Sequence, residues 1–192
     1  MIKHVTLIRH GETADNAAGI IQGWKDPGLN DNGKEQVRRA AHKIIPEQGI
    51  IFSSDLLRAR ESAAIIREVF ALKDFPYYID WRLRERSFGT LEGEPRDVEK
   101  MDLLFTGDPK AELYGSESEQ AFSDRVWSFV QDLRLVKAEN IYVVAHGGVL
   151  NRFGYLLDSS HGHIKHPNAA VITYDIDPLN AINEWEKRRE NH

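Results

Sequence analysis

The chain has 192 residues, a length at which one domain can bury most of its apolar surface. Hydrophobic residues make up 41% and charged residues 29% of the chain, which excludes a disordered or fibrous protein. A formal net charge of -5, without a long run of Lys and Arg, predicts no nucleic-acid partner and no membrane partner. The absence of cysteine excludes disulfides, thiolate metal sites and a cysteine nucleophile.

The N-terminal segment contains the first apolar run, residues 5–8, with charged residues on both sides. This run is too short for a signal peptide or a membrane anchor, so we expect a cytoplasmic protein. No internal repeat and no Gly/Ser-rich or Pro-rich linker divides the chain. The sequence therefore predicts a single domain over residues 1–192.

Four short apolar runs predict strands, at residues 5–8, 50–52, 141–145 and 171–174. The first three runs are continuous rather than alternating, which is typical of strands that are buried on both faces of a parallel sheet. The sheet is therefore predicted to be mostly parallel.

Helices are predicted between these strands from apolar residues at helical spacing. Residues 31–45 and 55–70 show this spacing, and Pro46 ends the first of them. A third helix is indicated over residues 122–136, preceded by a candidate capping box from Ser116 to Glu119. Because strands alternate with helices, the predicted class is α/β, with a central sheet flanked by helices.

Two stretches are compatible with more than one structure. Residues 89–118 are rich in Gly, Pro and acidic residues, and they fit either a helical excursion or a flap over a site. A turn is predicted at residues 177–180, and the polar tail after it fits either a terminal hairpin or a helix.

Charged and imidazole side chains follow three of the predicted strands. The first strand is followed by Arg9 and His10, the second leads to Arg58, and the third is followed by His146. Ligands of open α/β sheets bind at the carboxyl ends of the strands. Each histidine precedes a glycine, which lets the backbone come close to a ligand, and arginine donors match the geometry of phosphate. The pattern predicts a phosphate pocket, helped by the positive ends of the neighbouring helices.

The motif Arg9-His10-Gly11-Glu12 leads to a known family. Through this motif, the chain resembles the histidine phosphatase superfamily, which includes cofactor-dependent phosphoglycerate mutases and many small phosphatases. The resemblance implies a three-layer sandwich with a phosphoglycerate mutase-like fold. It covers nearly the whole chain and continues, in the order of the family, through Asn16 and residues 21–24, 29–33, 53–59, 83–85, 88–89, 91–93 and 145–148.

The resemblance also implies the catalytic roles. His10 would be the nucleophile and form a phosphohistidine that water then hydrolyses. Arg9, Arg58 and His146 would hold the phosphoryl oxygens. Glu85 would be the general acid, although its flanking arginines leave open a solvated carboxylate held in salt bridges.

Further positions match residues that bind the substrate in the family. These are Asn16, Gln22, Gly23 and Gly147. A metal site at residues 161–166, which contain three histidines, is the alternative, but no acidic cluster completes a set of ligands. The resemblance implies neither a metal nor a cofactor, and it is compatible with a homodimer.

The span from Gly89 to Gly115 decides between hydrolysis and transfer. In the mutases of the family this span is longer and carries paired arginines for the glycerate carboxylate, whereas here it is short and its cations are scattered. We therefore expect a metal-independent phosphomonoesterase that acts on a small phosphorylated metabolite, which the sequence does not identify. The alternative is a phosphoglycerate mutase-like phosphotransferase, and a non-catalytic module that binds a phosphorylated ligand ranks third.

Overall fold

The structure is a computed structural model, and it describes residues 3–71, 75–97, 99–100, 109–157 and 164–177. The predicted alternatives for the polar tail lie outside these residues, as do His161 and His163 of the alternative metal site. Among the described residues, no helix has the length and the apolar character needed to cross a membrane.

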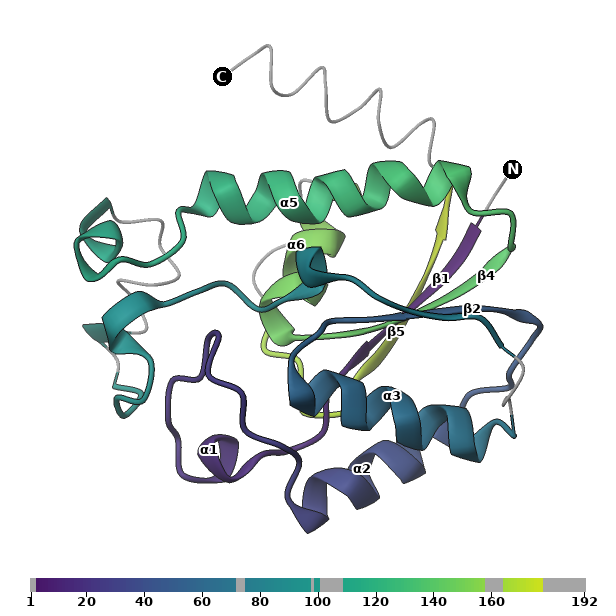
Figure 1. Cartoon of the computed structure of the whole chain (residues 1–192), viewed down its shortest axis with the longest axis horizontal. Coiled ribbons are helices and arrows are strands. Elements are labelled where there is room, and N and C mark those ends of the chain that lie inside the picture. Colours follow the sequence, from purple (N-terminus) through teal and green to yellow (C-terminus); the bar gives the residue numbers. More distant parts are fainter. Residues whose placement is uncertain (1–2, 72–74, 98, 101–108, 158–163, 178–192) are drawn as a thin grey trace.

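A five-stranded sheet with the order β3-β2-β4-β1-β5 forms the middle layer (Figure 1). The four predicted strands are confirmed, and the first four strands of this order run parallel, while β5 pairs with β1 in the antiparallel direction. Strand β3 was not predicted, because it has only three residues at the edge of the sheet. The strands are β1 (Lys3–Arg9), β2 (Gly49–Ser53), β3 (Tyr77–Ile79), β4 (Asn140–Ala145) and β5 (Val171–Ile176).

Helices cover both faces of this sheet, as the predicted three-layer arrangement requires (Figure 1). On one face, α2 (Asp31–Ala41) and α3 (Leu57–Val69) pack over β2 and β4, and on the other face lie α5 (Glu119–Asp132) and α6 (Gly147–Leu157). Each helix buries one apolar stripe against the strands, and this burial is the main stabilising contribution. The short helix α1 (Ala14–Ala17) follows β1.

The ends of the predicted helices need correction. The candidate capping box from Ser116 to Glu119 is wrong, because the N-cap of α5 is Ser118, whose Oγ accepts from the Ala121 N–H at 3.1 Å. The helix therefore begins directly after Ser118 rather than after Ser116. Helix α5 itself ends at Asp132, and a 3-10 turn over Leu133–Leu135 continues its path.

The segment 89–118 contains short turns in its described part. Two 3-10 turns span Gly89–Leu91 and Pro109–Tyr114, and η1 (Trp81–Leu83) precedes them. An antiparallel bridge between Ile20 and Pro95 ties the segment to the loop after α1. This contact brings residues 95–96 toward the carboxyl ends of the strands.

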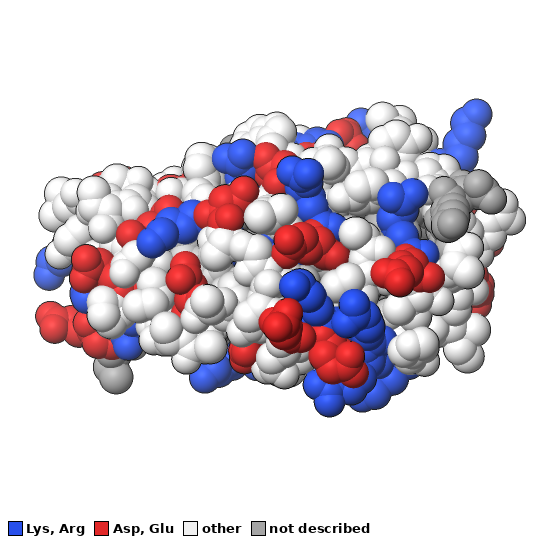
Figure 2. Space-filling model, turned by 60° about the horizontal axis from the view of Figure 1, so that its bottom comes forward, with Lys and Arg blue, Asp and Glu red and all other residues white. Residues whose placement is uncertain are grey.

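Charged side chains are mixed on the face of the molecule that Figure 2 shows. Red and blue groups lie next to each other over most of this face, with a larger group of Lys and Arg near its lower edge. Along α2, Glu35 forms ion pairs with Arg38 and Arg39. Exposed pairs of this kind contribute little to stability.

Candidate active site

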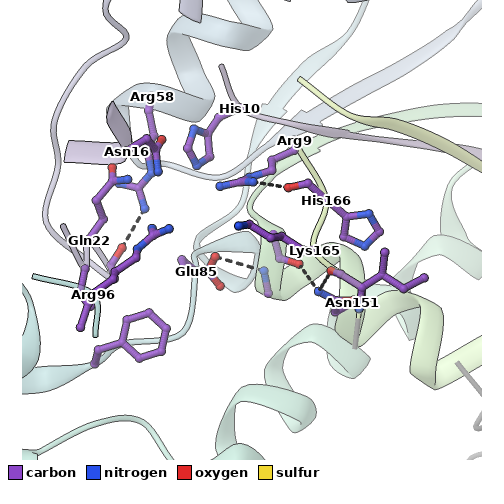
Figure 3. A pocket seen from close by; sticks show the side chains of 16 residues that line it. Arg9, His10, Asn16, Gln22, Arg58, Glu85, Arg96, Asn151, Lys165 and His166 are labelled. Atoms are coloured by element: carbon purple, nitrogen blue, oxygen red, sulfur yellow. Dashed lines mark hydrogen bonds between the residues drawn. The ribbon is translucent and has the colours of Figure 1, made fainter. Parts of the chain in front are cut away.

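A pocket of about 530 Å³ opens at the carboxyl ends of the parallel strands (Figure 3). The backbone N–H of His10, just after β1, donates to the Ala145 carbonyl at 2.9 Å, which places the ends of β1 and β4 side by side. The imidazole rings of His10 and His146 lie 5.1 Å apart. His146 is buried behind His10, and the predicted site residues that line the pocket are Arg9, His10, Asn16, Gln22, Gly23, Arg58, Glu85 and Gly147.

The ring of His10 is held in one tautomer. Its Nδ1 lies 2.6 Å from the Gly11 carbonyl oxygen, and because a carbonyl can only accept, Nδ1 carries the hydrogen. Burial, followed by the charges of Arg58 and Arg9, holds the pKa of His10 well below its usual value. The imidazole is therefore neutral at physiological pH, and its Nε2 has a free electron pair with which it can attack an electrophile.

Two guanidinium groups lie beside this ring, the buried Arg58 and the partly buried Arg9 (Figure 3). Arg58 is 1% exposed and donates to the carbonyls of Gly23 at 2.8 Å and Lys25 at 2.7 Å. Burial lowers its pKa to about 10, which still leaves it cationic at neutral pH. Arg9 donates to the His166 carbonyl, and burial lowers its pKa as well. Within the described part of the chain the buried Nε atom of each arginine has no hydrogen-bond partner.

His146 has one engaged and one unengaged ring nitrogen. Its Nε2 lies 2.9 Å from Ser54 Oγ, while Nδ1 is buried and has no partner among the described residues. Burial and the charge of Arg58 hold the pKa of His146 well below its usual value, so this ring is also neutral. A neutral ring offers one N–H donor, but His146 is fully buried and does not line the pocket, so its contact with a phosphoryl oxygen stays a prediction of the resemblance.

The Glu85 carboxylate is held on the side of the pocket formed by α6. One oxygen accepts from the Gly148 N–H at 3.1 Å, and the other accepts from the Arg86 N–H at 3.0 Å. The neighbouring guanidinium groups form salt bridges with other acids, since Arg84 pairs with Asp55 at 2.6 Å. Glu85 is therefore a pocket residue rather than a solvated member of a salt-bridge series.

Two amides complete the rim beside α1. Gln22 Oε1 accepts from the Thr13 hydroxyl at 3.0 Å, and Asn16 Oδ1 accepts from the Asn168 amide at 3.2 Å. Both amide oxygens are engaged in this way, so their NH₂ groups are the atoms that can donate to a bound anion.

Sequence reasoning did not identify several pocket residues. Arg96, Asn151, Lys165 and His166 line the pocket together with the predicted set (Figure 3). Arg96 reaches it through the bridge between Ile20 and Pro95, a long-range contact that has no local sequence signal. Within the described residues, no three His, Asp or Glu side chains form a group that could hold a metal ion.

Substitution of Gly148 tests how closely Glu85 must be held. A Cβ atom added at Gly148 would lie 2.1 Å from Glu85 Oε1, whereas one at Gly147 would meet only ordinary contacts, the nearest 3.6 Å from Arg9 Nε. Because the carboxylate ends a flexible side chain, we expect Gly148→Ala to fold, to displace the carboxylate and to lower kcat/KM by about 10- to 100-fold. Activity of Gly148→Ala within about twofold of the wild type, measured with an alkyl phosphate, would contradict this account of the Glu85 position.

Comparisons with known proteins agree with this arrangement. A model of the family described as histidine phosphatase superfamily (branch 1) matches residues 5–185. A protein of Arabidopsis thaliana named metal-independent phosphoserine phosphatase is 31% identical over 195 residues, which cover 96% of this chain and 81% of the relative. A 2,3-bisphosphoglycerate-dependent phosphoglycerate mutase of Parvibaculum lavamentivorans is 28% identical over 210 residues, 98% of each chain.

The fold is also shared with a solved structure. The crystal structure of phosphoglycerate mutase from Bacillus anthracis superimposes with a TM-score of 0.81 at 23% identity, over 92% of this chain and 89% of that one. A family model that matches almost the whole chain, together with relatives that include a phosphatase and a mutase, leads to one assignment. The chain belongs to the histidine phosphatase superfamily.

Proposed function

We propose that the protein is a metal-independent phosphomonoesterase that hydrolyses a small phosphorylated metabolite through a phosphohistidine on His10. The observation that carries the proposal is the neutral His10 ring, whose Nδ1 is tied to the Gly11 carbonyl, in one pocket with Arg9, Arg58 and Glu85. The pocket thus combines a nucleophile, positive charge for the phosphoryl oxygens and a carboxyl group for proton transfer.

The reaction proceeds in two steps. His10 Nε2 attacks phosphorus, the bond to the ester oxygen breaks, and a protonated Glu85 gives its proton to the leaving oxygen. Water then attacks the phosphohistidine, Glu85 takes a proton from this water, and the bond from phosphorus to nitrogen breaks to release phosphate. In both steps Arg9 and Arg58 stabilise the negative charge on the phosphoryl oxygens, a task that a metal ion performs in other phosphatases.

A phosphoglycerate mutase-like phosphotransferase is the second candidate, and the relative from Parvibaculum lavamentivorans supports it. A mutase must keep water from the phosphohistidine until the phosphoryl group returns to a second hydroxyl. Incubation with 3-phosphoglycerate separates the two candidates. Release of phosphate and glycerate supports the phosphatase, and conversion to an isomeric phosphoglycerate supports the mutase.

The pocket carries more positive charge than a phosphoryl group alone requires. Arg96 and Lys165 line its mouth, and in the view of Figure 3 Glu85 lies between them. Of the described residues that line the pocket, Glu85 is the one carboxylate. We propose that the substrate has a second anionic group, such as the carboxylate of a phosphorylated hydroxy acid or amino acid, because a charged group is attracted to unneutralised cations. The phosphoserine phosphatase among the relatives supports this class of substrate.

Substitution of Arg96 tests the second anionic group. We expect Arg96→Ala to lower kcat/KM for phosphoserine by about tenfold, because one partly exposed charge contact is lost. The kcat/KM for phenyl phosphate, which has no second anionic group, is expected to stay within about twofold of the wild-type value. Lys100→Ala is the control, because Lys100 lies in the same segment but pairs with Glu94 and Asp97. If Arg96→Ala slows both substrates equally, Arg96 does not recognise a second anion.

A further inference from the structure

Arg125, on α5, uses its guanidinium group both to hold the backbone that leads to Glu85 and to pair with Glu117. Its side chain is buried, with 7% of the residue exposed. Nη1 donates to the carbonyls of Arg82 and Arg84, both at 2.7 Å, and Nη2 donates to the Glu85 carbonyl at 2.8 Å. Nε and Nη2 also donate to the two carboxylate oxygens of Glu117, at 2.6 and 2.8 Å. All five N–H groups of the guanidinium therefore have acceptors.

Glu117 makes this buried arrangement stable. A buried guanidinium needs an opposite charge and acceptors for its donors, and the two-pronged contact with Glu117 supplies the charge. Glu117 also holds the chain just after Glu85, because its backbone N–H donates to the Ser87 carbonyl at 2.9 Å and its own carbonyl accepts from Arg86 Nε at 2.7 Å. The chain is thus held on both sides of Glu85.

Other contacts direct the Glu85 side chain away from Arg125. The Glu85 carbonyl accepts from Arg125 and also from Trp24 Nε1 at 2.7 Å, while the carboxylate lies at the other end of the residue against the Gly148 N–H. Fixing the carbonyl restricts the rotation of the peptide groups on either side, and hence the direction of the Cα–Cβ bond. The position of the carboxylate therefore depends on a guanidinium that does not line the pocket.

We propose that Arg125, aligned by Glu117, is a positioning residue for proton transfer by Glu85. This inference rests on the proposed role of Glu85 as general acid. A displacement of a reacting group by about 1 Å costs up to about 100-fold in rate, so loss of Arg125 slows the step in which the leaving oxygen takes up its proton. The hydrogen bonds that hold Arg9, Arg58 and His10 in place do not involve Arg125, so we expect binding of the phosphoryl group to change little.

The test compares leaving groups. 4-Nitrophenyl phosphate releases a stable anion and needs little help from an acid, whereas an alkyl phosphate needs the proton. We expect Arg125→Met to lower kcat/KM for the alkyl phosphate at least about tenfold more than for 4-nitrophenyl phosphate, with KM changed by less than about twofold. Arg82→Met is the matched control, because the Arg82 guanidinium binds Asp80 and the α5 residue Asp132 instead of the Glu85 carbonyl. It is expected to lower the melting temperature without this dependence on the leaving group.

Two further variants keep the inference falsifiable. If circular dichroism shows that Arg125→Met does not fold, Glu117→Gln, which keeps the size of the partner and removes its charge, is expected to show the same dependence to a smaller extent. Equal losses on both substrates in the folded variants, or the same dependence in Arg82→Met, overturn the role of Arg125. Glu85→Gln separates the acid role of Glu85 from the positioning role of Arg125. If Glu85→Gln shows the dependence on the leaving group and Arg125→Met and Glu117→Gln do not, only the positioning role fails. If it does not show the dependence, the acid role fails and the inference with it.

Discussion

Replacing His10 by Ala should lower turnover of every phosphate monoester by about 10⁴-fold or more, because no other group can take the place of a lost nucleophile. The Gly11 carbonyl fixes Nδ1 of the His10 ring, and the other ring nitrogen faces the pocket beside Arg9 and Arg58. Among the described residues, no other imidazole has this arrangement. The loss of turnover is measured from initial rates with 4-nitrophenyl phosphate, compared between His10→Ala and the wild type. A His10→Ala variant with more than about one hundredth of the wild-type rate would exclude His10 as the nucleophile.

His42 provides the control for this substitution. It is an exposed histidine at the C-terminus of α2, on the outer layer of the molecule. His42→Ala is expected to keep the wild-type rate. An excess of a metal chelator should also leave the wild-type rate unchanged, and a loss of activity that added metal restores would contradict metal-independent hydrolysis.

Replacing Arg58 by Met should lower kcat/KM by about 10³-fold, the size of effect seen when one buried donor to a developing negative charge is removed. Arg58 is almost fully buried beside His10, and its donors to the Gly23 and Lys25 carbonyls hold it in place. Methionine has a similar shape, so the change removes charge and donors more than it removes packing. Arg58→Lys, which keeps the charge but not the planar group, is expected to lose less.

The pH dependence of kcat/KM in Arg58→Met provides a second test of Arg58. Burial is the first cause of the low pKa of His10, and the charge of Arg58 is the second. Without that charge the pKa of His10 rises toward its ordinary value near 6.5, and since the neutral ring is the active form, the acid limb of kcat/KM moves to higher pH. In Arg58→Lys the limb is expected to stay near its wild-type position. An acid limb that does not move in Arg58→Met would contradict the electrostatic role of Arg58.

The sequence allowed prediction of those parts of the site that depend on topology. Parallel strands have their carboxyl ends at one edge of a sheet, so residues that follow three apolar runs had to meet there. Arg9, His10 and Arg58 line the pocket for this reason, with His146 directly behind His10. The same reasoning predicted the helical layers, because apolar stripes at helical spacing have to be buried against the sheet.

Other parts depend on contacts between distant segments. Arg96 lines the pocket because Pro95 pairs with Ile20, and Lys165 does so from the loop before β5. The position of Glu85 depends on Arg125 and Gly148, which lie 40 and 63 residues further along the chain. No periodicity or spacing reports such contacts, so the sequence alone left a solvated Glu85 open, and only the resemblance to the family favoured the pocket.

The central claim, a phosphohistidine on His10, can be measured directly. The enzyme is mixed with excess 4-nitrophenyl phosphate, denatured in alkali within the first turnovers, and digested for mass spectrometry, because phosphohistidine is stable in base and labile in acid. The account predicts one phosphoryl group on the peptide that carries His10, which disappears on brief treatment with acid. A phosphoryl group on another residue, or none in an enzyme that releases nitrophenol in a burst, would contradict it.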